Sequence, residues 1–100
     1  MAKKPHSIKL AVKLGNSLAE IGNFKEAAKA FQQALTLEPA NPNRYTDLAK
    51  ALEYSGQYDE AIKVLQNGIE AMMTMGRRQI AANLQKELDL VKLNKNRQQK

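Results

Sequence analysis

Few residues of this chain have types and spacings that could support catalytic chemistry. The 100 residues contain no cysteine and a single histidine, His6, which has no second candidate ligand near it. A lone histidine of this kind is poorly placed for metal binding or general-base catalysis. Carboxylates stand at expected helix starts, as in Lys25-Glu26 and Asp59-Glu60, where they favour the helix N-terminus. With no glycine-rich phosphate loop either, the sequence predicts a protein that is not an enzyme and uses no cofactor or metal.

Basic side chains are concentrated at the two ends of the chain. The net charge is +6, and residues 1–13 and 92–100 each hold four lysines or arginines and no acid. Residues 14–91 hold eight basic and ten acidic side chains. Basic ends can attract nucleic acid, so a nucleic-acid accessory protein is one alternative. The last residues, NKNRQQK, have no aromatic ring for base stacking, which argues against that alternative and predicts a frayed, solvated tail.

The sequence also gives an expectation for the location of the protein. No apolar run approaches the roughly 20 residues that a membrane-spanning helix needs. The first residues, MAKKPHSIKLAVK, lack the long apolar core and cleavage site of a signal peptide. We therefore expect a cytoplasmic protein without membrane contact.

The elements that position any binding residues repeat along the chain. The segment GNFKEAAKAFQQAL at residues 22–35 returns as GQYDEAIKVLQNGI at residues 56–69, an offset of 34 residues. Apolar or small residues recur at helical spacing in two stripes per copy. The stripes are Ala11, Leu14, Gly15 and Leu18, then Ala27, Phe31, Ala34 and Leu35, and in the second copy Tyr45, Leu48, Ala49 and Leu52, then Ala61, Leu65, Gly68 and Ile69. Gly22 and Gly56 separate the stripes, where helices often end in a left-handed residue, and small residues such as Gly15 let the paired helices approach closely.

This pattern resembles the tetratricopeptide repeat family, whose 34-residue unit carries Trp-x-x-Leu-Gly-x-x-Tyr, then Ala-x-x-x-Phe, then Pro. The first copy matches at Leu14, Gly15, Ala27, Phe31 and Pro39. The second copy departs from the pattern at its end, where Met73 replaces the proline. The resemblance implies an all-α, right-handed solenoid of antiparallel helix hairpins.

A further apolar stripe predicts a fifth helix after the two copies. Ala81, Leu84, Leu88 and Val91 repeat the spacing of the earlier first helices, which is what a terminal capping helix requires. Gln85 stands where the copies have Gly15 and Ala49, so we expect a looser contact there. The expected organisation is an N-terminal lead at 1–7, repeats at 8–41 and 42–75, a capping helix at 76–93 and a basic tail at 94–100.

In the family that the chain resembles, the first helices of the hairpins form a groove that holds a peptide or a partner protein. The helical register carries this groove to Lys9, Val12, Lys13, Asn16, Asn43, Thr46, Asp47, Lys50, Gln79, Ala82, Asn83 and Lys86, with Tyr54 either projecting into it or covering the hairpin turn. Amides bind peptide backbone and lysines favour carboxylates, so the expected ligand is an extended acidic peptide or a C-terminal tail. A simply solvated helix face is the alternative.

One subclass of the family binds acidic chaperone tails through a two-carboxylate clamp. That clamp needs Lys and Asn on the first helix, Asn on the third, and Lys and Arg on the fifth. The matching places here hold Val12, Asn16, Asp47, Gln79 and Asn83. Only Asn16 fits, so the sequence argues against this clamp and leaves the general groove.

Self-association is a further expectation. About three repeat units are usually needed for a stable stack, and this chain has two and a capping helix. Leu90 and Leu93 fall outside the stripe of the capping helix, which predicts a homo-oligomer or a docking partner there. Met72, Met73 and Met75 either pack the fourth helix against the fifth or form an adaptable binding patch.

Overall fold

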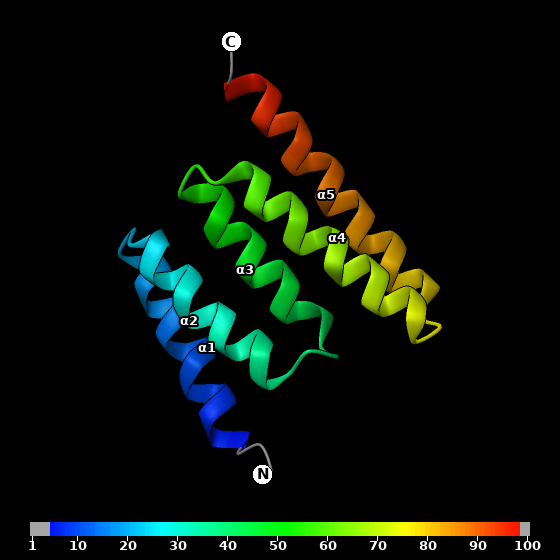
Figure 1. Cartoon of the computed structure of the whole chain (residues 1–100). Helices are drawn as coiled ribbons and strands as arrows, with labels where there is room; N and C mark the ends of the chain where they lie inside the picture. The colour runs from blue at the N-terminus through cyan, green and yellow to red at the C-terminus, as the bar shows by residue number, and fades with distance from the viewer. Residues whose placement is uncertain (1–4, 99–100) are drawn as a thin grey trace.

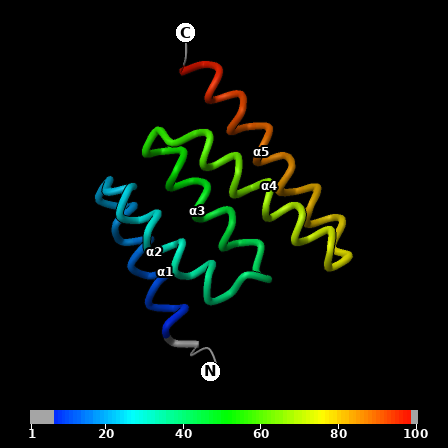
Figure 2. The backbone as a smooth tube through the Cα atoms, viewed as in Figure 1, coloured from blue at the N-terminus to red at the C-terminus, as the bar shows by residue number. Residues whose placement is uncertain are grey.

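A computed structural model describes the backbone of residues 5–98, which form five α-helices and no strand. Successive helices run antiparallel and lie beside one another in chain order, from α1 at one end of the stack to α5 at the other (Figures 1 and 2). The predicted all-α stack of helix hairpins is confirmed. The helices are α1 Pro5–Glu20, α2 Phe24–Leu37, α3 Pro42–Tyr54, α4 Tyr58–Thr74 and α5 Arg78–Gln98.

Three of the four connections between helices are the same tight turn. Gly22, Gly56 and Gly76 each adopt a positive φ, of 83°, 86° and 76°, which only glycine takes without a steric penalty. After each glycine, the next N–H donates to a carbonyl five residues back, at 2.8 Å in all three turns. The left-handed residues expected at Gly22 and Gly56 are confirmed. The turn at Gly76 joins α4 to α5 in the same way. The packing of α5 along α4 is as extensive as that between the helices of each hairpin.

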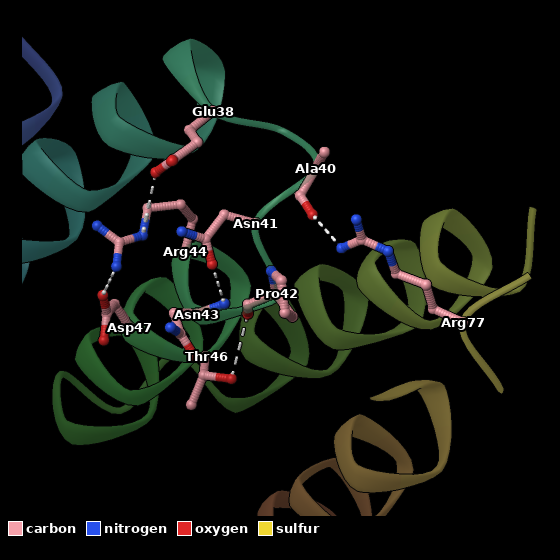
Figure 3. A network of polar contacts seen from close by, with 9 residues as sticks. All are labelled: Glu38, Ala40, Asn41, Pro42, Asn43, Arg44, Thr46, Asp47 and Arg77. Carbon is pink, nitrogen blue, oxygen red and sulfur yellow. Dashed lines mark hydrogen bonds and ion pairs between the residues drawn. The ribbon is translucent and has the colours of Figure 1, made fainter. Parts of the chain in front are cut away.

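The connection between the hairpins, residues 38–41, is longer and is held by polar contacts (Figure 3). Asn41 caps α3 by accepting a hydrogen bond from the Asn43 N–H at 2.9 Å, and Pro42 occupies the first helical position. The Tyr45 hydroxyl donates to the Pro39 carbonyl at 2.8 Å. From the α4–α5 turn, Arg77 donates to the Ala40 carbonyl at 3.4 Å. The connector that precedes α3 is thus held by side chains from α3 itself and from the α4–α5 turn.

The close approach expected between paired helices is present. Ala27, Ala34 and Ala61 are completely buried. A Cβ atom added to Gly15 would lie 2.5 Å from Cε1 of Phe31, so only glycine fits beside this ring. The helices of the first hairpin therefore depend on the absence of a side chain at this position.

The first helix differs from the sequence expectation. Leu14 was predicted to lie in the buried stripe, yet its exposed fraction is 52%, whereas Leu48 at the equivalent position of α3 is 2% exposed. Leu48 of α3 belongs to the same buried cluster as Ala27, Ala28 and Phe31 of α2. Within residues 5–98, no helix precedes α1 to cover Leu14 in the same way.

The three methionines near the end of α4 also separate. Met72 is fully buried in the core that α4 and α5 share, as one of the two interpretations expected. Met73 and Met75 are exposed, so the interpretation that they pack in the core is wrong for these two residues.

The end of α5 corrects the expectation of a frayed tail. The helix continues to Gln98, because Asn94 donates a hydrogen bond to the Glu53 carboxylate and Lys95 forms an ion pair with Asp59. Basic residues in a last helical turn are also favoured by the helix dipole. At the other end, α1 begins at Pro5, earlier than the lead at 1–7 implied. The expectations for the His6 side chain and for residues 1–4 and 99–100 lie outside what the structure describes.

None of the helices in residues 5–98 combines the length and the apolar composition needed to cross a membrane.

Candidate functional site

A large hollow lies between α1 and the start of α3. It has a volume of about 860 Å³ and is open to solvent. Four predicted groove residues from α1 line it together with side chains from the connector and α3. The lining residues are Ile8, Lys9, Leu10, Val12, Lys13, Asn16, Glu38, Asn41 and Arg44. The wall therefore combines aliphatic side chains with three cationic ones.

Arg44 is the central polar side chain at this end of α3 (Figure 3). Its guanidinium lies 4.0 Å from the Glu38 carboxylate and 3.5 Å from that of Asp47, and its side chain is only 13% exposed. The Nε–H of Arg44 is buried and donates no hydrogen bond to any residue that the structure describes. Arg44 thus joins the connector to α3, with its buried Nε atom 4.0 Å from the Glu38 carboxylate.

Asp47 lies further along α3 from the connector. Burial raises the pKa of this carboxyl above its ordinary value, and the positive charges of Arg44 and Lys50 act in the opposite direction. The cost of desolvating the carboxylate is the larger effect. Asp47 is therefore a half-buried acid surrounded by cations.

A second, smaller hollow of about 150 Å³ continues along α1 and α3. The Tyr54 ring packs against Phe24 with ring centroids 5.2 Å apart and an angle of 53° between the planes. Tyr54 nevertheless remains exposed and lines this hollow with Asn16 and Lys50. The Tyr54 ring thus packs on Phe24 at the start of α2 and also lines this hollow.

The concave side between α3 and α5 has a different character. A hollow of about 290 Å³ is lined here by Pro42, Asn43, Thr46, Ile80, Asn83, Leu84 and Glu87. The predicted residues Asn43, Thr46 and Asn83 are brought together, whereas Gln79, Ala82 and Lys86 are not among the lining residues. Gln79 instead donates to Asn83 at 3.4 Å. Among the residues predicted on α5, only Asn83 lines this hollow, and Glu87 is also in its wall.

Sequence reasoning did not identify Glu38, Asn41, Arg44 and Glu87. The first three belong to the proline-bounded connector and the first turn of α3, where helical periodicity gives no information. Opposite charges at Glu38 and Arg44 on either side of the Pro39–Pro42 segment were a usable signal for a contact across it.

No group of three histidine, cysteine, aspartate or glutamate side chains that could hold a metal ion occurs among the residues that the structure describes.

Comparisons with known proteins agree with the helical repeat. The sequence model of a family described as tetratricopeptide repeat matches residues 18–77. A TPR repeat-containing thioredoxin from Arabidopsis thaliana is 39% identical to this chain over 51 residues. That segment covers 51% of this chain and 8% of the relative, so the similarity concerns a small part of the plant protein.

Proposed function

Because the chain belongs to the tetratricopeptide repeat family, whose repeats mediate protein–protein interaction, we propose that it is a non-catalytic module whose groove holds an extended acidic peptide between α1 and α3. The peptide would belong to a partner protein. The helices of such a groove are ordered before binding, which keeps the entropic cost of association low.

The observation that carries the proposal is the unequal charge of the two halves of the concave side. Lys9, Lys13 and Arg44 line the hollow between α1 and α3 against one acid, Glu38. Beyond it, Lys50 and Asp47 face the smaller hollow. The half between α3 and α5 has Glu87 in its wall. The charge of an acidic peptide is therefore complementary to the α1–α3 half. The proposed peptide site covers only this half of the groove that the sequence predicts.

The remaining wall residues suggest how the groove would recognise such a peptide. The Asn16 amide can both donate to and accept from an extended peptide backbone. Lys9 and Lys13 are exposed in the wall, and a charge-assisted bond from a lysine to a peptide carboxylate is stronger than a neutral one. Ile8, Leu10 and Val12 offer an apolar wall beside these groups. We therefore expect the best ligand to place an aliphatic side chain next to its acidic residues.

The test uses fluorescein-labelled peptides rich in Asp and Glu with one leucine, and basic peptides of the same length. We expect the acidic set to bind the full chain in anisotropy titrations, and the double variant Lys13→Glu with Lys50→Glu to raise Kd by about ten- to hundredfold. The matched control is Lys25→Glu with Lys63→Glu, which reverses two exposed lysines on the second helices of the hairpins. Equal binding by both double variants, or equal binding of basic and acidic peptides, would refute the groove proposal.

The alternative of assembly or docking through the capping helix has its own support. Leu90 and Leu93 on α5 are each about half exposed. Replacing both with Glu should abolish that contact without changing the far-UV circular dichroism spectrum. The nucleic-acid alternative is weaker, because Lys95 in the basic C-terminal segment is already paired with Asp59.

A further inference from the structure

The outer face of α1 carries an uncovered apolar stripe. Leu10, Leu14, Ser17 and Ile21 follow one another at spacings of four, three and four residues, which places them on one side of the helix. The three aliphatic side chains have exposed fractions of 62%, 52% and 77%. Ile21 stands just after the helix but continues its pattern, because its N–H still donates to the Ser17 carbonyl at 3.4 Å. Contiguous apolar surface of this kind commonly marks an interaction site.

The same face of α3 shows what stacking inside the array requires. The residues 34 positions further on are Arg44, Leu48, Ala51 and Ser55. Leu48 and Ala51 are buried against α2. Arg44 is instead paired with Glu38, and the Ser55 hydroxyl bonds to the Leu52 carbonyl at 2.8 Å. Stacking on a neighbouring repeat thus uses two apolar positions and leaves the outer two polar.

On α1 the outer two positions hold Leu10 and Ile21, so its stripe is longer than stacking on a repeat needs. The stripe is also self-complementary. In an antiparallel pair of α1 helices with a two-fold axis midway between residues 14 and 17, Leu14 faces the partner's Ser17. Leu10 then faces the partner's Ile21. Each layer pairs residues that fit together, as in an antiparallel helix pair, and the small serine leaves room for a leucine.

The charges beside the stripe fit the same arrangement. Lys13 and Glu20 are exposed, lie two turns apart, and flank the stripe on the side of the groove. In the antiparallel pair, Lys13 comes beside the partner's Glu20, and the two-fold axis repeats that ion pair. The opposite flank of α1 is covered by α2, where Ala11, Gly15 and Leu18 make the hairpin contact.

We propose that the exposed α1 stripe is the contact surface for a second copy of this chain, forming a two-fold dimer with antiparallel α1 helices. A closed two-fold contact is the commonest form of homo-oligomer. This inference does not require that the groove binds a peptide, but the dimer contact shares Leu10 and Lys13 with the groove wall. It places self-association at the opposite end of the stack from α5.

Sedimentation equilibrium of the full chain over a dilution series tests the proposal. The wild type should show a reversible equilibrium between monomer and twice the monomer mass. Leu14→Glu should remain a monomer at every concentration used, with an unchanged far-UV circular dichroism spectrum because Leu14 is exposed. The matched control, Leu90→Glu with Leu93→Glu on α5, should dimerise as the wild type does.

A charge exchange tests the pairing itself. Lys13→Glu alone and Glu20→Lys alone should each raise the dimer Kd by roughly three- to thirtyfold, because each places like charges side by side at two symmetric positions. The double variant, with both changes, should return the Kd to near the wild-type value. This recovery is specific to an interface that brings residue 13 of one copy beside residue 20 of the other.

Three results would overturn the proposal. If the chain stays monomeric at every concentration, the stripe does not bind a second copy, and its partner would be a helix of another protein or a lipid surface. A dimer lost in the Leu90 and Leu93 variant but kept by Leu14→Glu would place the contact on α5. A double charge variant as weak as the single ones would rule out the antiparallel pairing.

Discussion

The two hairpins fill the same contacts between helices with different side chains. In the first hairpin Gly15 lies against Phe31, and the equivalent pair of the second hairpin is Ala49 and Leu65. A larger ring on one helix is thus matched by the loss of a methyl group on the other. The two changes nearly cancel in side-chain volume, as close packing requires.

The second such exchange has the opposite sense. Ala11 and Ala34 of the first hairpin correspond to Tyr45 and Gly68 of the second, where a Cβ added to Gly68 would lie 2.9 Å from the Tyr45 ring. The two repeats therefore keep the fit between paired side chains, although the residue at each single position differs. A family pattern written position by position does not contain these pairings.

The largest contrast between the hairpins lies in their equivalent leucines, Leu14 and Leu48. Leu48→Ala should lower the free energy of unfolding by about 2–5 kcal/mol, because Leu48 is buried between α2 and α3. Leu14→Ala should lower it by about 0.5 kcal/mol or less, as expected for an exposed side chain. Urea denaturation of both variants at low protein concentration, where self-association contributes little, measures the two values. Equal costs would show that Leu14 is covered within the monomer.

The exchange of Gly15 and Phe31 gives a smaller effect that can be reversed. Alanine is normally preferred over glycine within a helix by about 1 kcal/mol. Gly15→Ala should nevertheless destabilise the chain by about 1–3 kcal/mol, because the new methyl group overlaps the buried Phe31 ring.

Adding Phe31→Leu to that variant recreates the pair found in the second hairpin and should recover most of the loss. Thermal or urea unfolding of the two single variants and the double variant gives the coupling energy. Purely additive effects would contradict the idea that the two positions share one volume.

Much of the fold follows from periodicity and punctuation in the sequence. The helix pairs, the left-handed turns at Gly22 and Gly56 and the capping position of α5 could be predicted because each depends on residues close in sequence. The exposure of Leu14 could not, because it depends on whether a neighbouring helix is present. The contacts of Asn94 and Lys95 could not be predicted either, since they involve side chains more than 35 residues apart.

The groove shows the same division. Lys9, Lys13 and Asn16 were found from helical register, and they do line the hollow between α1 and α3. Arg44 was missed because it stands in the first turn of α3, where helical periodicity gives little information. It is drawn into the wall by the Glu38 carboxylate on the connector. Contacts made by connectors therefore have to be seen in three dimensions before a groove can be assigned.

The smallest expected effect concerns Asp47, whose counterpart in the first hairpin is the exposed Lys13. Burial raises the pKa of Asp47, so between its unfolded and folded values the native state holds a proton that the unfolded chain has lost. The stability that Asp47 contributes is therefore greatest below its ordinary pKa of about 3.9 and falls as the pH rises through the folded value. Arg44→Gln removes the positive charge that opposes this shift and should raise the pKa of Asp47 further. Carboxyl-detected NMR titration of the wild type and of Arg44→Gln gives both values directly, and an Asp47 pKa that is lower in Arg44→Gln than in the wild type would mean that this ion pair does not stabilise the Asp47 carboxylate in the folded chain.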